Sequence, residues 1–316
     1  MTRVREAANR FTELFPLWVG LAGALSFFRP EFFTWFSGSW ITIGLGIIML
    51  GMGLTLTLED FRRVFKIPYQ VFLGVFLHFT VMPFLGWSGA KLFALSSPLA
   101  VGLILVACSP CGTASNVINY IARSDVPLAV TITAVSTLLA VAMTPLLTGL
   151  LAESRMDVDA WGLILSTLQV IFLPVSAGIV LNYFFPEKTK KILPVSPVFA
   201  VVVIALIVGS ILGSNRQAIL DGGFRLIGAV LFLHGSGFIL GYFLARIFVS
   251  EISSRTISVE VGMQNSGLAV VLARANFANP LVAVPGAISS FCHSAIGSFL
   301  AAWWRWKSDR STLSSS

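Results

Sequence analysis

Residues 92–122 read LFALSSPLAVGLILVACSPCGTASNVINYIA and contain no Asp, Glu, Lys or Arg. A helix needs about 20 mostly apolar residues to cross the hydrocarbon core of a bilayer. This stretch is long enough, but Pro110 and Gly112 lie within it and are followed by hydroxyl and amide side chains. Proline removes a backbone donor and clashes with the preceding turn, and glycine tolerates the backbone that results. The stretch therefore predicts a membrane-spanning helix that is interrupted inside the membrane.

The same pattern of long uncharged stretches continues along the chain. Of the 316 residues, 56% are hydrophobic and 11% are charged, and the mean hydropathy is +0.88; soluble domains average about 25% charged residues. Further uncharged stretches of 15 or more residues cover 14–28, 32–58, 67–90, 126–152, 160–186, 192–215, 226–245 and 275–304. The stretch 256–273 is as apolar as these, apart from Glu260. We therefore predict an all-α membrane protein with ten transmembrane helices.

The basic residues favour one side of the membrane. Ten spans that start in the cytoplasm place 15 of the 21 Lys and Arg residues in cytoplasmic segments. The other six are Arg29, Lys91, Arg155, Arg216, Arg225 and Arg274. The positive-inside rule then predicts that both termini are cytoplasmic. The net charge of +7 is spread over these loops, so it does not indicate a nucleic-acid partner.

The ends of the chain and its cysteines indicate neither processing nor redox chemistry. Residues 1–13 carry charges of both signs and lack the apolar core of a signal peptide. We expect a cytoplasmic segment there and a cytoplasmic tail at 305–316. The three cysteines lie inside apolar stretches and cannot form a disulfide framework. Cys108 and Cys111 form a C-x-x-C sequence, but they lie in a predicted membrane helix, where small residues at a helix–helix contact explain them better than a redox role.

The chain contains signs of an internal duplication. Phe76-Leu77-His78 in the third span matches Phe232-Leu233-His234 in the eighth, and the polar segment 112–116 in the fourth span corresponds to 262–267 in the ninth. Transporters are often built from two halves of inverted topology. Five spans per half is an odd number, so the second half would enter the membrane from the opposite side. We predict two inverted five-helix repeats, 14–152 and 160–304.

Glu260 is the only acidic residue well inside a span. A carboxylate at this depth is costly and usually faces a cavity, a partner or an ion. Gln264, Asn265 and Ser266 follow it, and hydroxyl and amide side chains occupy the corresponding part of the first half. Oxygen donors of this kind suit Na⁺. A protonated glutamate that is hydrogen-bonded in a packed bundle remains the alternative.

The three histidines also lie in predicted spans. A histidine in a membrane often serves only as a hydrogen-bonded contact between helices, and we favour that interpretation for His234. For His78 and His293 a functional role stays open. None of them has a carboxylate or a second histidine three or four residues away, so known metal-binding patterns are absent.

The strings 112–116, GTASN, and 260–269, EVGMQNSGLA, followed by 284–287, VPGA, resemble the bile acid:sodium symporter family, in particular its short bacterial members. The resemblance covers essentially the whole chain. It implies a panel domain of spans 1, 2, 6 and 7 and a core domain of spans 3, 4, 5, 8, 9 and 10, in which spans 4 and 9 unwind and cross. It also implies a bacterial inner-membrane location.

The resemblance further implies the residues of the transport site. One sodium ion would be held by Ser115, Asn116, Thr133 and Glu260. A second would be held by Glu260, Gln264, the carbonyls of Val261 and Met263, and His78. Substrate would lie between panel and core, against Gly112, Thr113, Asn265, His293 and Ser294.

Three positions differ from the pattern of the family. Ala129 stands where close bacterial relatives have a serine that adds an oxygen to the first sodium site. Ser294 follows His293 where relatives often have an asparagine that contacts substrate. His78 stands where some relatives have a glutamine at the second sodium site. The first difference bears on the affinity of the first site, and the second on the identity of the substrate.

The hypothesis that follows is a sodium-coupled symporter, not an enzyme. It would carry a small organic anion, bile-acid-like or pantoate- or keto-acid-like, by alternating access of core against panel. Two Na⁺ ions, the anion and membrane lipid are the expected partners, and no obligatory protein partner is evident. A proton-coupled anion carrier that uses Glu260 or His78 is the alternative. An intramembrane enzyme is more remote, because no nucleophile motif accompanies Ser115.

Overall fold

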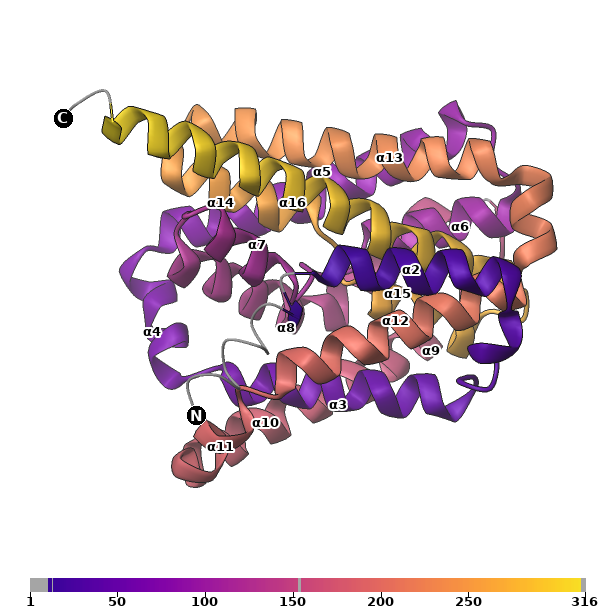
Figure 1. Ribbon diagram of the computed structural model, residues 1–316, viewed down its shortest axis with the longest axis horizontal. Helices are drawn as coiled ribbons and strands as arrows, with labels where there is room; N and C mark the ends of the chain where they lie inside the picture. The colour runs from indigo at the N-terminus through magenta and orange to yellow at the C-terminus, as the bar shows by residue number, and fades with distance from the viewer. Residues whose placement is uncertain (1–10, 13, 153–154, 314–316) are drawn as a thin grey trace.

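The computed structural model describes residues 11–12, 14–152 and 155–313, without the side chains of 218, 221–222 and 308–313. The named elements of these residues are all helical (Figure 1). In chain order they are α2 (Phe15–Phe28), η1 (Pro30–Phe32), α3 (Ser39–Thr55), α4 (Leu58–Lys66), α5 (Pro68–Leu92), α6 (Ser97–Ala107), α7 (Ser115–Ile121), α8 (Val126–Ala152), α9 (Ala160–Thr167), η2 (Leu168–Phe172), α10 (Leu173–Phe184), α11 (Pro186–Ile192), α12 (Ser196–Ser214), α13 (Arg216–Arg246), α14 (Glu251–Gly262), α15 (Ser266–Asn276), η3 (Pro280–Ala283) and α16 (Val284–Leu313).

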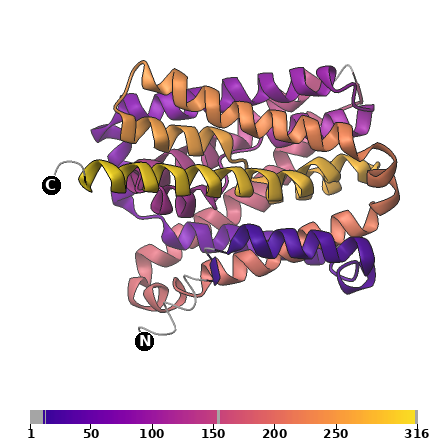
Figure 2. The ribbon, with the colours of Figure 1, turned by 45° about the horizontal axis from the view of Figure 1, so that its top comes forward.

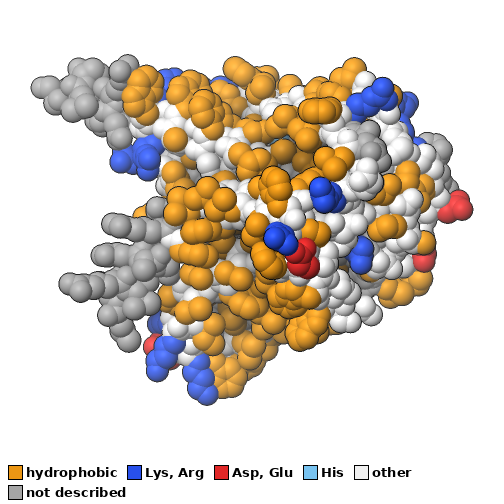
Figure 3. Space-filling view, turned by 45° about the vertical axis from the view of Figure 1, so that its right-hand side comes forward, with side chains coloured by type: hydrophobic (Ala, Val, Ile, Leu, Met, Phe, Trp, Pro, Cys, Tyr) orange, Lys and Arg blue, Asp and Glu red, His pale blue; other side chains and the backbone are white. Residues whose placement is uncertain are grey.

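Several of the described helices are long and apolar enough to cross a membrane. Six qualify by length and composition: Pro68–Leu92, Val126–Ala152, Ala160–Phe184, Ser196–Ser214, Gly223–Arg246 and Pro280–Lys307. The bent pair of α3 and α4 adds a seventh if it is counted as one span. The ten predicted spans exceed this number because α2 and α6 are short and because the stretch around Glu260 is divided between α14 and α15. Figure 3 shows hydrophobic side chains over much of one face and few charged ones.

Some helices extend beyond the uncharged stretches that predicted them. α13 begins at Arg216, so Arg216 and Arg225, which the sequence placed in a loop, belong to its first turns. An uncharged stretch marks only the hydrocarbon-embedded part of a helix, and a helix can continue where arginine side chains reach water. α16 likewise continues to Leu313, so most of the predicted tail 305–316 is helical. The predicted segment 1–13 lies almost entirely outside the described residues.

The helices pack in two sets. α3 packs mainly against α10, and α2 mainly against α12, which also contacts α3. The second set is arranged around α13, which packs on α5, α14 and α16, while α6 and α8 pack on α5. α3, α10 and α12 lie apart from α5 and α13 in both ribbon views (Figures 1 and 2). α16 joins the sets through α2 and α12, and α15 joins them through α3 and α9.

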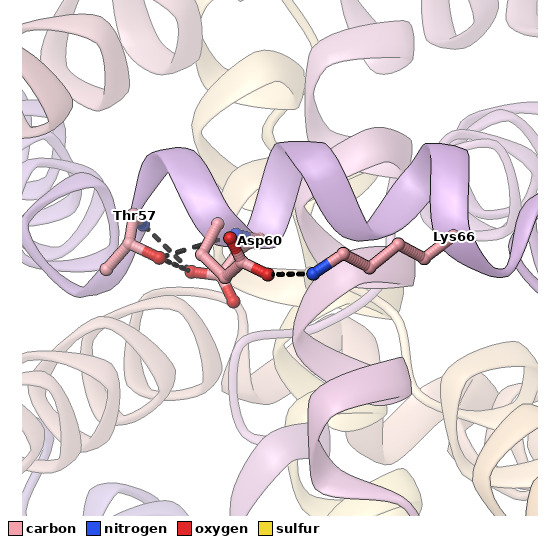
Figure 4. Close-up of polar contacts among 4 residues, drawn as sticks. Thr57, Asp60 and Lys66 are labelled. Atoms are coloured by element: carbon pink, nitrogen blue, oxygen red, sulfur yellow. Dashed lines mark hydrogen bonds and ion pairs between the residues drawn. The ribbon is translucent and has the colours of Figure 1, made fainter.

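α4 is a charged helix that follows α3 after a bend of 66°. The Asp60 carboxylate accepts the Thr57 backbone N–H at 2.8 Å, and the Thr57 hydroxyl accepts the Asp60 N–H at 3.4 Å (Figure 4). This capping box satisfies two backbone donors at the start of the helix. Lys66 forms an ion pair with Glu59. No residue of α4 is buried, which is typical of a helix that lies along a membrane surface.

Candidate functional site

Two of the apolar stretches are interrupted where the sequence predicted a break. α6 ends at Ala107, and the next helix, α7, begins at Ser115. α14 ends at Gly262, and α15 begins at Ser266. Non-helical backbone at membrane depth persists only where protein or a water-filled cavity satisfies its polar groups. The two breaks are therefore the first place to look for a site.

The two breaks satisfy part of this requirement by pairing with each other. Gly112 N–H donates to the Met263 carbonyl at 2.9 Å, and Asn265 N–H donates to the Pro110 carbonyl at 2.8 Å. A Cβ atom on Gly112 would lie 2.7 Å from the Gln264 backbone oxygen. Glycine is needed at 112 because the two backbones approach so closely. Gly112, predicted as a substrate residue, thus has a structural role at this contact.

Glu260 lies in the last turn of α14 and is fully buried. Both of its carboxylate oxygens have side-chain partners. Thr133 Oγ1 of α8 donates to Oε2 at 2.7 Å, and Asn119 Nδ2 of α7 donates to Oε1 at 3.0 Å. Ser115 Oγ lies 3.5 Å from Thr133 Oγ1. The carboxylate therefore connects the second break to α7 and α8, three elements that are far apart in the sequence.

Two buried amide oxygens of α7, which also carries the Asn119 group that donates to Glu260, lack a hydrogen-bond partner. They are Oδ1 of Asn116 and Oδ1 of Asn119, both buried and both unpaired within the described part of the chain. A buried polar atom without a partner is unfavourable by about 1–3 kcal/mol. Together with the Ser115 and Thr133 hydroxyls, these oxygens form a donor set that fits a hard cation such as Na⁺. Ala129, also fully buried, lies one helical turn before Thr133 and adds no side-chain oxygen.

Gln264 and His78 link the two breaks on another side. His78 Nδ1 lies 3.0 Å from the Glu260 carbonyl, and Nε2 lies 2.9 Å from the Ser109 carbonyl. The Gln264 amide is best turned so that its nitrogen donates to Ser109 O at 2.6 Å and lies 3.2 Å from His78 Nε2. In the opposite orientation its oxygen would take that place beside the Ser109 and Pro110 carbonyls. That arrangement would bring acceptors together, so the amide nitrogen faces these carbonyls.

The carbonyls predicted for the second sodium ion belong to buried residues. Val261 and Met263 are both fully buried. Gly112 N–H already occupies one position on the Met263 carbonyl. A carbonyl oxygen has two lone pairs, so this contact leaves one of them available to an ion.

A separate polar network lies around the second break. His234 Nδ1 lies 2.8 Å from the Gly262 carbonyl, and His234 Nε2 lies 2.6 Å from Ser289 Oγ. Ser289 Oγ is 2.6 Å from Ser266 Oγ, which is 3.2 Å from His293 Nε2. The carbonyl requires a donor, so Nδ1 carries the proton and Nε2 accepts from Ser289. His234 therefore makes the interhelical contact that the sequence favoured, and His293 belongs to the same network.

A cavity of about 320 Å³ lies between the two sets of helices. Its walls come from α2, α3, α7, α8 and α12, together with the first break, and they are mostly apolar. Thr113 and Asn116 contribute polar groups to it. Gly112, Asn265, His293 and Ser294 are not among its lining residues. Of the five residues predicted to bind substrate, only Thr113 lines this cavity.

Asn265 is used locally instead. Its Oδ1 accepts the Leu268 N–H at 3.1 Å and caps α15, while its Nδ2 lies 3.8 Å from Met49 Sδ of α3. Ser294 is fully buried and its hydroxyl donates to the Ser290 carbonyl at 2.7 Å. Both residues therefore make local hydrogen bonds and do not line the cavity in this conformation.

The sequence grouped Asn119 with the polar side chains of the first half that correspond to the Glu260 region but gave it no ligand role, and it did not single out Ser136. Asn119 donates directly to the carboxylate. Ser136 Oγ accepts the Cys111 N–H at 3.3 Å and so supports the first break. The spacing contained a signal for both, because Asn119 follows Ser115 by four residues and Ser136 follows Thr133 by three, which puts each pair on one helix face.

Comparison with known proteins identifies the family of the chain. A sequence profile described as the Sodium Bile acid symporter family matches residues 42–222. The chain is 51% identical over 292 residues to a protein of Arabidopsis thaliana named probable sodium/metabolite cotransporter BASS1, chloroplastic; the match covers 92% of this chain and 73% of that protein. It is 40% identical over 305 residues to the uncharacterized sodium-dependent transporter YocS of Bacillus subtilis; the match covers 96% of this chain and 94% of that protein.

A third relative agrees with these two. The chain is 45% identical over 295 residues to the probable sodium/metabolite cotransporter BASS2, chloroplastic, of Oryza sativa subsp. japonica, covering 93% of this chain and 70% of that protein. The matches to these relatives extend over most of the chain and so agree with the whole-chain resemblance of the sequence. With a family profile over more than half of its length and relatives of this identity, the chain belongs to the sodium bile acid symporter family.

Proposed function

We propose that the protein is a secondary active transporter that couples the inward flow of Na⁺ to the uptake of a small organic anion. The observation that carries this proposal is the fully buried Glu260 carboxylate at the meeting point of two broken helices. Its carboxylate accepts hydrogen bonds from the Thr133 hydroxyl and the Asn119 amide. A buried carboxylate in such a setting is suited to a cation that arrives and leaves.

The first sodium ion would use Glu260, Thr133, Ser115 and Asn116. The support for this assignment is the unpaired Oδ1 of Asn116, which lies next to Ser115 in the sequence and faces no donor in the described structure. Binding of Na⁺ would replace the hydrogen bond from Thr133 to the carboxylate with shared coordination of the ion. Ala129 supplies no side-chain oxygen, so we expect this site to be weaker than one with a serine there.

The second sodium ion would use Glu260, Gln264 and the carbonyls of Val261 and Met263, with His78 beside them. The buried position of Gln264, with its amide beside the Ser109 carbonyl and His78, supports this assignment. Without an ion, the nitrogen donates to the Ser109 carbonyl at 2.6 Å. With an ion, a half turn of the amide would direct its oxygen inward. The amide would then serve as a reporter of sodium occupancy.

The anion would bind in the cavity beside the first break. None of the described residues that line this cavity is basic, so the positive charge that holds the anion must come from elsewhere. Sodium ions at the neighbouring crossing would supply it. Thr113 and Asn116 would contribute hydrogen bonds from the cavity wall. Asn265, His293 and Ser294 remain proposed substrate residues for another conformation of the transport cycle.

Coupling would arise because both ligands use the same segment. Asn116 lines the cavity and has an unpaired, buried Oδ1, and it is also one of the proposed sodium ligands. Sodium that orders residue 116 therefore prepares the anion site, and the anion in turn favours sodium. Such reciprocity is a thermodynamic requirement for any pair of sites that share an ordered element.

The same proposal includes the domain motion and the orientation. The panel would consist of α2, α3, α9, α10 and α12, and the core of α5 to α8 and α13 to α16, as inverted repeats 14–152 and 160–304. The core would move against the panel about the midplane site, in the cytoplasmic membrane with both termini inside. Two Na⁺ with a monoanion carry one net charge, and each inward charge contributes about 2.3 kcal/mol per 100 mV.

Thermal unfolding of the purified protein tests the proposal. The unfolding temperature would be measured in NaCl and in KCl at equal ionic strength, because a ligand of the folded state stabilises it by RT ln(1 + [L]/Kd). We expect a saturable increase in Na⁺ alone. Uptake of labelled keto acids and hydroxy acids into proteoliposomes would then require Na⁺ outside. Equal curves in both salts, with uptake that follows a pH gradient, would replace sodium coupling by proton coupling.

A further inference from the structure

A second hollow, which the transport site does not use, lies on the outside of the α3, α10 and α12 set. It has a volume of about 610 Å³ and is formed by α3, α10, α11 and α12. Its walls are mostly apolar, with Ile47, Leu50 and Leu54 on one side and Leu181, Ile192 and Phe199 among those on the other. In Figure 1, α11 projects at the lower left, beside the ends of α3 and α12.

The apolar walls of this groove follow one face of α3. Ile47, Leu50 and Leu54 are three and four residues apart, so they form one stripe along the helix. The rise from the first to the last is about 10 Å. Ile192 and Phe199 on the other wall are exposed on the described chain. Side chains of this kind at the outer surface of a membrane protein are suited to contact with an acyl chain.

One end of the groove carries a lysine. Lys188 of α11 lines it, and its Nζ lies 5.2 Å from the Phe185 ring. Within the described part of the chain Lys188 forms no ion pair with a carboxylate, whereas Lys190 on the same helix is 2.7 Å from Glu187. Lys191 adds a third positive charge to this short helix. The groove is therefore apolar along its length and positively charged at one end.

We propose that this groove binds one molecule of an anionic phospholipid, with the phosphate at Lys188 and an acyl chain along the α3 stripe. The charge at one end and the apolar walls together match a lipid, and neither feature alone would. A small hydrophilic anion would leave the apolar walls uncovered, and a lipid without net negative charge would be attracted less strongly by the lysine. Clusters of basic residues next to membrane helices attract anionic headgroups. The sequence places α11 on the cytoplasmic side by the positive-inside rule.

The position of the groove gives the lipid a structural consequence. Gly51 and Ser196 line both the groove and the central cavity. A Cβ atom on Gly51 would collide with the Ser196 hydroxyl, so the wall between the two spaces is thin and closely packed there. A lipid in the groove would therefore press on the outer side of this shared wall.

Native mass spectrometry of the full chain in detergent tests the assignment. The probes are phosphatidylglycerol and phosphatidylcholine with identical acyl chains. One lysine near a membrane surface contributes enough to favour the anionic lipid about fivefold. We expect one phosphatidylglycerol to be retained in preference to phosphatidylcholine by that factor. Equal retention of the two lipids by the unmodified protein would overturn the proposal.

Variants locate the lipid on the protein. Lys188→Gln should abolish the preference for phosphatidylglycerol, while Lys190→Gln, which alters the lysine paired with Glu187, should keep it. Ile192→Trp, at an exposed position in the groove, should reduce the retention of both lipids about equally. Equal losses in the two lysine variants, or unchanged retention in Ile192→Trp, would place the lipid elsewhere. Competition by millimolar inorganic phosphate alone would reassign Lys188 to a free anion and would also overturn the proposal.

Discussion

The two breaks have related sequences but differ in how their polar groups are used. Near the first break, the amide oxygens of Asn116 and Asn119 have no partner in the described residues, and Thr113 lines the central cavity. In the second break the polar side chains are bonded to protein: Asn265 caps α15, and Ser266 is held by Ser289 and His293. The first break is thus left open to ligands, and the second is braced.

The difference indicates that the two broken helices have different roles at the proposed ion site. Glu260 lies just before the second break, and its carboxylate accepts hydrogen bonds from Thr133 of α8 and from Asn119 of α7, the helix that follows the first break. A rigid support for the charge and an adaptable set of oxygens around it are both useful for reversible ion binding. Mutations of the polar side chains at the two breaks should therefore have different signatures: loss of sodium response for the unpaired side chains near the first, and loss of stability for the bonded ones around the second.

The largest expected effect comes from removing the shared charge. Glu260→Gln keeps the shape of the side chain and one of its two acceptor oxygens, replaces the other with an N–H donor, and leaves no anion for the proposed sodium sites. Sodium affinity should fall by more than about 100-fold, beyond the loss typical of an outer-shell partner. The stability in KCl should be unchanged or higher, because a neutral amide is cheaper to bury. Thermal unfolding in NaCl and KCl measures both quantities.

A sodium-specific increase in the unfolding temperature of Glu260→Gln would contradict the assignment of this carboxylate. The unfolding temperature in KCl serves as the control, because it shows whether the variant is folded before the sodium response is interpreted.

Gly112→Ala tests the contact between the two breaks. The added Cβ would lie 2.7 Å from the Gln264 backbone oxygen, and a backbone atom cannot move aside as a flexible side chain can. Overpacking of this kind typically lowers stability by about 1–3 kcal/mol. Gly46→Ala in α3, where nothing lies within 4 Å of the new atom, is the matched control and should be neutral or slightly stabilising. Equal unfolding temperatures for the two variants would show that the backbones do not meet as described.

Ser289→Ala tests the brace of the second break. It removes the hydroxyl between His234 and Ser266 and leaves buried polar atoms unpaired, so stability should fall by about 1–3 kcal/mol. The loss should be equal in NaCl and KCl, because this network does not contact the proposed ions. Ser290→Ala, which removes only a 3.3 Å contact to the Gly286 carbonyl within α16, should be milder. A selective loss of the sodium response in Ser289→Ala would make the brace part of the ion site.

The sequence predicts the helices and the breaks well because both depend on local features. Uncharged stretches mark hydrocarbon-embedded helices, and Pro110 with Gly112 marks a place where a helix cannot continue. The start of α13 outside the uncharged stretch was missed, since Arg216 and Arg225 are compatible with a helix that begins before it enters the hydrocarbon. Charge marks where a helix crosses the membrane boundary but not where the helix begins.

The contacts inside the site are less predictable because they join distant residues. Asn119 and Glu260 are 141 positions apart, and no periodicity indicates which helix faces meet. Resemblance to a family named Thr133 and Ser115, but not Asn119. The same resemblance assigned Asn265 and Ser294 to substrate. In this conformation, however, Asn265 bonds to the backbone of α15 and Ser294 to the backbone of α16. Only the folded chain shows which polar groups are still free.

The smallest expected effect comes from a substitution near the first break, which tests what limits sodium affinity there. Ala129 and Thr133 are one turn apart on α8 and share a helix face, so Ala129→Ser would place a hydroxyl beside the proposed first sodium site. A hydrogen-bonding group next to a charge is worth about a tenfold change in affinity. Sodium should therefore stabilise this variant at about tenfold lower concentration, measured by the midpoint of the NaCl titration. Ala134→Ser, also buried on α8 but on another face, should leave that midpoint unchanged.

A gain in the Ala129→Ser variant alone would mean that the first break lacks only one oxygen ligand. The sodium affinity would then be set by the number of oxygen ligands and not by the rigidity of the crossing. No gain would mean that the crossing, and therefore the braced half, sets the affinity.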